Sequence, residues 1–212
     1  MMLSAAAGPG RQADTGGDDV FNLMADSLWA GPLLWMAIYI SDYSFTIACA
    51  RLYRAQGKIA FEGSVELNPL FQADVDALRR VSPRFCLALI VSTGYLSLVR
   101  WISGPLTGSG DLYLFVLGAM ILLEATIHMR HLRNWFLFKK VIPIIQGRLE
   151  YPRGILLQMS AYEILTFSVL YAALFWVTGS MFLLGGTIAC CSLSVRHYRL
   201  ARRYKAALSK AA

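Results

Sequence analysis

Five long apolar stretches alternate with short polar segments along the chain, at residues 28–53, 83–103, 111–138, 154–177 and 181–198. Each approaches the ~20 residues that an α-helix needs to cross a hydrocarbon core of ~30 Å. The second has the clearest start, because Ser82 and Pro83 have the form of an N-cap followed by proline at the first helical position. Only residues 178–180 separate the last two, which predicts an antiparallel hairpin. The predicted fold class is all-α, a polytopic integral membrane helical bundle with five transmembrane helices within residues 27–205.

The polar segment between the first two stretches contains one further predicted helix, over about residues 69–81. Asn68 resembles an N-cap, and proline follows it at the first helical position. Phe71, Val75 and Leu78 fall on one face of this helix, and the charged side chains fall elsewhere. This pattern is typical of a short helix that lies flat in the membrane interface. We therefore expect a short cytoplasmic interfacial helix beside the bundle.

Composition agrees with a lipid environment. The 212 residues are 57% hydrophobic and 16% charged, whereas a soluble domain carries about 25% charged residues. The pI near 9.4 does not predict nucleic-acid binding, because the basic residues stand at helix ends rather than on one face of a soluble domain. The four cysteines all fall inside apolar stretches, so no disulfide framework is expected. Membrane lipids are the expected surroundings.

Basic residues give the orientation, because Lys and Arg near helix ends stay in the cytoplasm. With the N-terminus outside, 18 of the 20 basic residues fall on the inner side. This predicts an external N-terminus and a cytoplasmic C-terminal tail at residues 206–212. Residues 1–26 lack the basic start and apolar core of a cleaved signal peptide and are predicted to be a disordered external tail. No transit peptide is visible, which favours the plasma (inner) membrane of a bacterium or archaeon.

Three carboxylates lie inside predicted spans, where ionisable groups are costly and usually functional. With a rise of 1.5 Å per residue, Asp42 and Glu124 lie ~21 Å and ~20 Å below the outer starts of their helices, and Glu163 lies ~14 Å above the inner start of its own. These depths nearly coincide, which predicts a ligand-binding site in the cytoplasmic half. Alternatively, Asp42 or Glu163 forms a structural ion pair with Arg196 or Arg130, or is protonated in a contact between helices.

The third span carries the most informative face, because Glu124, His128 and His131 occupy positions i, i+4 and i+7. Imidazole and carboxylate are suitable ligands for Zn, Fe, Mn or Cu, so a divalent metal is the candidate cofactor. The same groups are suited to relaying protons or to acid–base chemistry. Alternatively, the histidines only reach the wet cytoplasmic interface. On the first span, Thr46 extends the polar stripe that begins at Asp42.

The cytoplasmic loop after the first span adds Glu66 and Asn68. In one interpretation they fold back beneath the bundle and complete the site of Asp42 and Glu124. In the other, Glu66 is a solvated charge and Asn68 only caps a helix.

A resemblance follows from these residues. Asp42 and Thr46, four residues apart, followed by the sequence Glu-Leu-Asn-Pro at residues 66–69, resemble a pattern in a family of small bacterial and archaeal multi-span membrane proteins. The resemblance covers about residues 39–72. That family has no assigned activity, so the resemblance directs attention to Asp42, Glu66 and Asn68 without implying what they do.

Familiar catalytic and nucleotide-binding signatures are absent from the sequence, including HExxH, GxSxG, the Walker loop and GxGxxG. We therefore expect a membrane protein with a buried polar site that handles a cation, a metal or a small polar solute, as a transporter would. A membrane-embedded enzyme, metal-dependent or using acid and base groups, that acts on a lipid is the second hypothesis. A structural or assembly partner is the third. A homo-oligomer and a membrane-protein partner both remain open.

Overall fold

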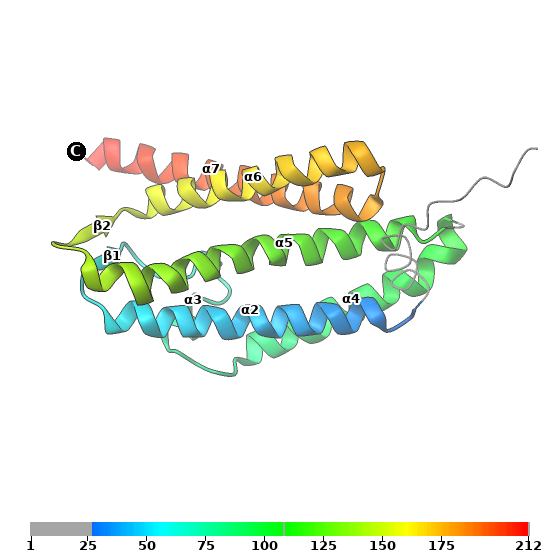
Figure 1. The fold of residues 1–212 in the computed structure, drawn as a ribbon, viewed down its shortest axis with the longest axis horizontal. Helices are drawn as coiled ribbons and strands as arrows, with labels where there is room; N and C mark the ends of the chain where they lie inside the picture. Colours follow the sequence, from blue (N-terminus) through cyan, green and yellow to red (C-terminus); the bar gives the residue numbers. More distant parts are fainter. Residues whose placement is uncertain (1–26, 108, 212) are drawn as a thin grey trace, which may run out of the picture.

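The computed structural model describes residues 27–107 and 109–211, and its long elements are all α-helices (Figure 1). The long helices are α2 (Ala30–Ala55), α4 (Pro83–Thr107), α5 (Asp111–Phe136), α6 (Arg153–Thr178) and α7 (Met181–Ala211), and α3 (Gln72–Asp76) is short. A π-helical turn (Leu137–Val141) and a 3-10 turn (Ile142–Ile144) continue α5. The predicted N-terminal tail at residues 1–26 lies outside the described residues. The prediction of a helical protein is confirmed.

Four of these helices are long and apolar enough to cross a membrane: α2, α4, the continuous segment Asp111–Ile144, and α6. The length and composition of these four helices therefore confirm the prediction of a transmembrane protein. α7 is not among them, because its second half carries five basic residues between Arg196 and Lys205. Its helix also continues to Ala211, well beyond the predicted end at residue 198. The extension follows from its composition, since Ala, Leu, Arg and Lys are strong helix formers.

The helix α5 lies at the centre of the bundle (Figure 1). It packs against α2 and α4 on one side and against α7 on the other, whereas α6 packs mainly on α7 and barely touches α5. One hydrophobic cluster joins α2, α4, α5 and α7 and includes Trp35, Leu96, Tyr113, Leu117 and Phe182. The hairpin between α6 and α7 turns at Gly179, whose φ of 67° is in the left-handed region that favours glycine. α2 and α6 are therefore separated by α5 and α7 for most of their length.

The helix predicted over residues 69–81 is much shorter in the structure. α3 comprises only five residues and ends before Leu78, which adopts a φ of 52° that a helix does not allow. Asp74, which we expected on the exposed side, is buried and accepts hydrogen bonds from Ser82 Oγ (2.6 Å) and Arg79 Nη1 (2.9 Å). Ser82 Oγ also accepts the backbone N–H of Phe85, which is the predicted N-cap contact of α4.

A two-stranded parallel sheet, which the sequence did not predict, joins the loops at one end of the bundle. β1 (Ile59–Phe61) follows α2, β2 (Leu149–Tyr151) precedes α6, and Ile59 pairs with Leu149. Lys58 Nζ donates to the backbone carbonyl of Ile145 (2.6 Å), and Glu62 Oε2 accepts the backbone N–H of Arg153 at the start of α6 (2.9 Å). These contacts hold the loop after α2 beneath the helices.

Candidate functional site

Two carboxylates from neighbouring helices meet inside the bundle. Asp42 lies on α2 and Glu124 on α5, and the two helices pack against each other. A carboxylate oxygen of each residue and a ring nitrogen of His128 all lie within 4.8 Å of one another. The polar stripe predicted on the first span thus lies against the polar face predicted on the third.

Both ring nitrogens of His128 have partners. Nδ1 lies 2.9 Å from the backbone carbonyl oxygen of Glu124, and Nε2 lies 3.1 Å from Ser41 Oγ. A carbonyl oxygen only accepts hydrogen bonds, so Nδ1 donates and carries the hydrogen. Nδ1 is also the nitrogen that lies 3.7 Å from Asp42 Oδ1. The imidazole nitrogen nearest Asp42 is therefore the protonated one, and its N–H is used by the Glu124 carbonyl.

His131 lies one turn closer to the end of α5 and is buried. Its Nε2 lies 3.3 Å from Asp42 Oδ1 and 3.1 Å from Thr46 Oγ1. Cys49 Sγ, one turn further along α2, donates to the backbone carbonyl of His131 at 3.4 Å. Asp42, Thr46 and Cys49 therefore contact a single residue of α5, which aligns the two helices at this depth.

Two carboxylate oxygens of this group are buried and receive no hydrogen bond: Asp42 Oδ1 and Glu124 Oε2. Asp42 Oδ1 is within ion-pair distance of both imidazoles, but neither contact has hydrogen-bond geometry. A buried carboxylate oxygen normally has a hydrogen bond or a positive partner, because its desolvation is costly otherwise. The pair thus has unused capacity for a proton or another cation.

A cavity of about 250 Å³, the Asp42 cavity, opens beside these carboxylates. Glu66 and Asn68 line it, so the loop does fold back beneath the bundle. Asn68 Oδ1 also accepts the backbone N–H of Leu70 (3.1 Å), which is a local turn contact. Asn68 does not cap α3, because the N-cap of that helix is Phe71. The interpretation of Asn68 as a helix cap is therefore wrong.

The Glu66 carboxylate is half-buried, and its Oε1 accepts the backbone N–H of Asn68 at 2.6 Å. Burial raises the pKa of Glu66 above its ordinary value, while the Asn68 hydrogen bond and the positive charges of Arg130 and His131 oppose this rise. Glu66 is therefore the acid of this loop that lines the Asp42 cavity.

Glu163 does not join the other predicted site residues. Its Oε1 pairs with Arg133 Nη1 at 2.9 Å, and it lines a second cavity between α5 and α6. Neither Asp42 nor Glu163 forms the expected ion pair with Arg196 or Arg130; their ion-pair partners in the described residues are histidines and Arg133. Asp42 and Glu163 lie at similar depths along their helices but are not close to each other, because α5 separates α2 from α6.

The positive wall of the Asp42 cavity is a feature that the sequence pattern did not predict. Arg130, Arg153 and Arg196 line it, and His197 lines it beside them. Arg130 Nη1 donates to Ser160 Oγ (2.9 Å), which in turn contacts His197 Nδ1 (3.0 Å). In the sequence analysis these basic residues indicated only the orientation of the chain in the membrane. Helical spacing puts Arg130 on a different side of its helix from Glu124, His128 and His131, so the pattern offered no signal for it.

Comparisons of the chain with family models, curated proteins and solved structures found no match. The resemblance of residues 39–72 to small multi-span proteins therefore stays a prediction.

Proposed function

We propose that this chain is a five-span plasma-membrane protein, with its N-terminus outside and its C-terminus in the cytoplasm, that binds a proton on the Asp42–Glu124 pair. Proton binding and release would be coupled to the passage of a small polar solute. The observation that carries the proposal is the pair of buried, unpartnered oxygens, Asp42 Oδ1 and Glu124 Oε2, on adjacent helices.

The fifth span is supported by the packing of α7. Its apolar first half runs along both α6 and α5, although its basic second half keeps it out of the set of clearly apolar helices. At 1.5 Å per residue, a helix of 31 residues is ~46 Å long, so it can cross a ~30 Å core and still extend its basic end into water. β1, β2 and the C-terminus lie at one end of the bundle (Figure 1), the end with most of the basic residues. In this proposal α3 lies at the cytoplasmic membrane interface.

Cysteine labelling tests this topology. In a chain whose four native cysteines are replaced by alanine, Ser180→Cys in the α6–α7 turn should react with an impermeant maleimide added to intact cells. Lys205→Cys near the end of α7 should react only after the membrane is permeabilised. Equal access of both positions from one side would contradict a spanning α7.

A proton suits the site because two buried carboxylates within 4.8 Å of each other cannot both stay ionised without a counter-charge between them. His131 contacts Asp42 and lies closer to the cytoplasmic end. Both His131 and Glu66 line the Asp42 cavity. These residues form a sequence of titratable groups from the loop to the pair, as a proton route requires.

A divalent metal held by Asp42, Glu124 and His128 is the second candidate, since these three donors lie together. It would support the hypothesis of a metal-dependent enzyme acting on a lipid. The geometry of His128 favours the proton, because the Nδ1 that faces Asp42 carries a hydrogen and Nε2 meets Ser41. His131, the third metal ligand suggested by the sequence, is not part of the cluster. Elemental analysis of wild type against Glu124→Gln separates the two: stoichiometric metal lost in the variant would favour the enzyme.

Infrared spectroscopy tests the proton directly. A carboxylic-acid C=O band should be present in the purified protein near neutral pH and should be lost in Glu124→Gln or Asp42→Asn. Glu150→Gln, which changes an exposed carboxylate, is the control and should keep the band. In proteoliposomes, the two site variants should abolish proton flux. An unchanged band and unchanged flux in both site variants would leave a structural or assembly role as the better account.

A further inference from the structure

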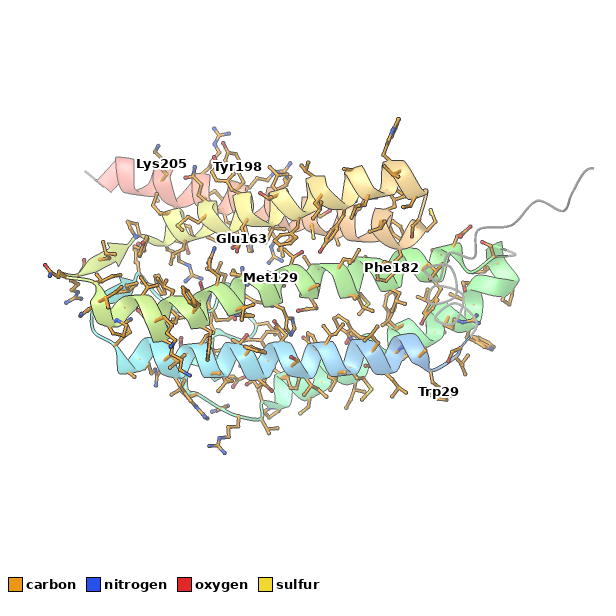
Figure 2. All side chains as sticks on the ribbon, viewed as in Figure 1. Trp29, Met129, Glu163, Phe182, Tyr198 and Lys205 are labelled. Atoms are coloured by element: carbon orange, nitrogen blue, oxygen red, sulfur yellow. The ribbon has the colours of Figure 1, made fainter. Side chains whose placement is uncertain are left out.

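The second cavity, of about 320 Å³, lies between the inner halves of α5 and α6, and we call it the α5–α6 cavity. It exists because α6 is held by α7 and barely touches α5. Figure 2 shows Glu163 on the side of α6 that faces α5. The volume of the α5–α6 cavity is at the lower end of the ~300–1,000 Å³ that is typical of small-molecule sites. The space therefore suits one compact organic molecule.

The deep end of this cavity is polar and contains a positive charge without a direct ion-pair contact in the described residues. Arg130 donates to Ser160, but no carboxylate oxygen in the described residues lies within 4.0 Å of its side-chain nitrogens. Close by, Glu163 uses Oε1 for Arg133, while its Oε2 is buried and receives no hydrogen bond. One anionic acceptor and one hydrogen-bond donor would satisfy Arg130 and Glu163 together.

The end of the cavity nearest the loops is mostly apolar. Phe61, Leu67, Tyr151, Leu156 and Val141 line it, and Glu66 adds one acid from the loop. The basic residues Arg130 and Arg133 lie on α5, deeper than Phe61 and Tyr151, whereas a lipid headgroup facing the cytoplasm would need them near the mouth. A molecule that enters from the cytoplasmic end would have to insert its charged end first and leave an apolar body near the mouth.

We propose that the α5–α6 cavity binds a small amphipathic zwitterion, such as an α-amino acid with an apolar side chain. Its carboxylate pairs with Arg130, its ammonium donates to Glu163 Oε2, and its side chain packs against Leu156 and Phe61. This inference deepens the proposed function and rests on it for the view that the bound molecule is the transported solute. The two cavities share a wall of residues that would join the solute to the proton site: Thr46, Glu66, Leu67, Arg130 and His131.

Three probes with the same apolar body test the charge requirements: leucine, 4-methylpentanoate, which lacks the ammonium, and 3-methylbutylamine, which lacks the carboxylate. Calorimetric titration of the full-length protein in detergent should show leucine binding most tightly, 4-methylpentanoate more weakly, and 3-methylbutylamine not at all. Arg130→Gln should weaken leucine binding by about 10- to 100-fold, the value of a charge-assisted hydrogen bond. Arg148→Gln, an exposed arginine paired with Glu150, should leave it unchanged.

Two further variants keep the test sharp if Arg130→Gln does not fold. Arg130→Lys keeps the charge but not the planar fork and should weaken leucine binding by a smaller factor. Leu156→Trp fills the apolar end and should lower the affinity for leucine and 4-methylpentanoate alike. No leucine binding to wild type, or equal binding of leucine and 3-methylbutylamine, would overturn the proposal. Loss of the infrared band in Glu124→Gln does not depend on any of these probes, so the proton site and the solute site fail separately.

Discussion

The backbone carbonyl of Phe182 on α7 occupies the place where a side chain on Gly118 of α5 would have to lie. The relation is reciprocal, because the carbonyl of Phe115 on α5 occupies the corresponding place beside Gly185 of α7. The two helices thus approach through their backbones, as small residues permit in membrane bundles. This contact fixes α5 against α7 and, through α7, sets the position of α6.

Gly118→Ala should lower the free energy of unfolding by about 3 kcal/mol, at the upper end of overpacked sites, because a rigid backbone atom rather than a side chain is in the way. Gly94→Ala is the matched control, since Gly94 lies in helix α4 and an added methyl group there would meet no other atom within 4 Å. It should be neutral or stabilising by about 1 kcal/mol. Unfolding in mixed micelles measures both. Equal effects of the two changes would mean that the close approach of α5 and α7 does not limit stability.

Arg133→Ala should destabilise the protein more than the double change Arg133→Ala with Glu163→Ala. The single change leaves Glu163, which is largely buried, without its only ion-pair partner in the described residues, and the double change removes that uncompensated charge. A double-mutant cycle on thermal unfolding should show a favourable coupling of about 0.5–3 kcal/mol. A coupling of zero would indicate that water screens the charge of the half-exposed Arg133 and that its ion pair with Glu163 does not stabilise the protein.

Stability at low pH should depend on Asp74. The hydrogen bond from Ser82 lowers the pKa of Asp74 below its ordinary 3.8, with further help from Arg79 and Arg84, and desolvation opposes this. A lowered pKa in the folded state stabilises the protein above pH 3.8, and this stabilisation is lost as the pH falls through the folded value. Wild type should therefore unfold at a higher temperature than Asp74→Asn at neutral pH, and the difference should shrink in acid. A difference that is constant with pH would exclude ionised Asp74 as the cause.

Glu62→Gln should loosen the start of α6. The Glu62 carboxylate accepts the first N–H of that helix at Arg153 and lies at the positive end of its dipole, a contact of about 1 kcal/mol. Hydrogen exchange at residues 153–156 should accelerate in this variant and stay unchanged in Glu150→Gln, whose carboxylate pairs only with Arg148 among the described residues. Unchanged exchange in Glu62→Gln would assign the order of this helix end to the β1–β2 pair instead.

The sequence by itself determined the five long helices. Long apolar runs bounded by Ser82, Pro83 and Gly179 specify the helices and their order, because hydrophobic length and capping act within a few residues. The sequence also predicted two polar helix faces, one with Asp42 and Thr46 and one with Glu124, His128 and His131. Helical spacing alone puts such residues on one side of a helix.

Only the tertiary structure decided which of these groups meet. Glu163 lies at a depth similar to that of Asp42 but lines another cavity. No local sequence pattern predicts the order in which the helices pack, so the sequence did not separate the two residues. The β1–β2 pair and the contact of Arg130 with Ser160 depend on residues far apart in the chain. Such contacts are set by how the helices pack, with α5 in the centre and its backbone close to that of α7 at Gly118 and Phe182.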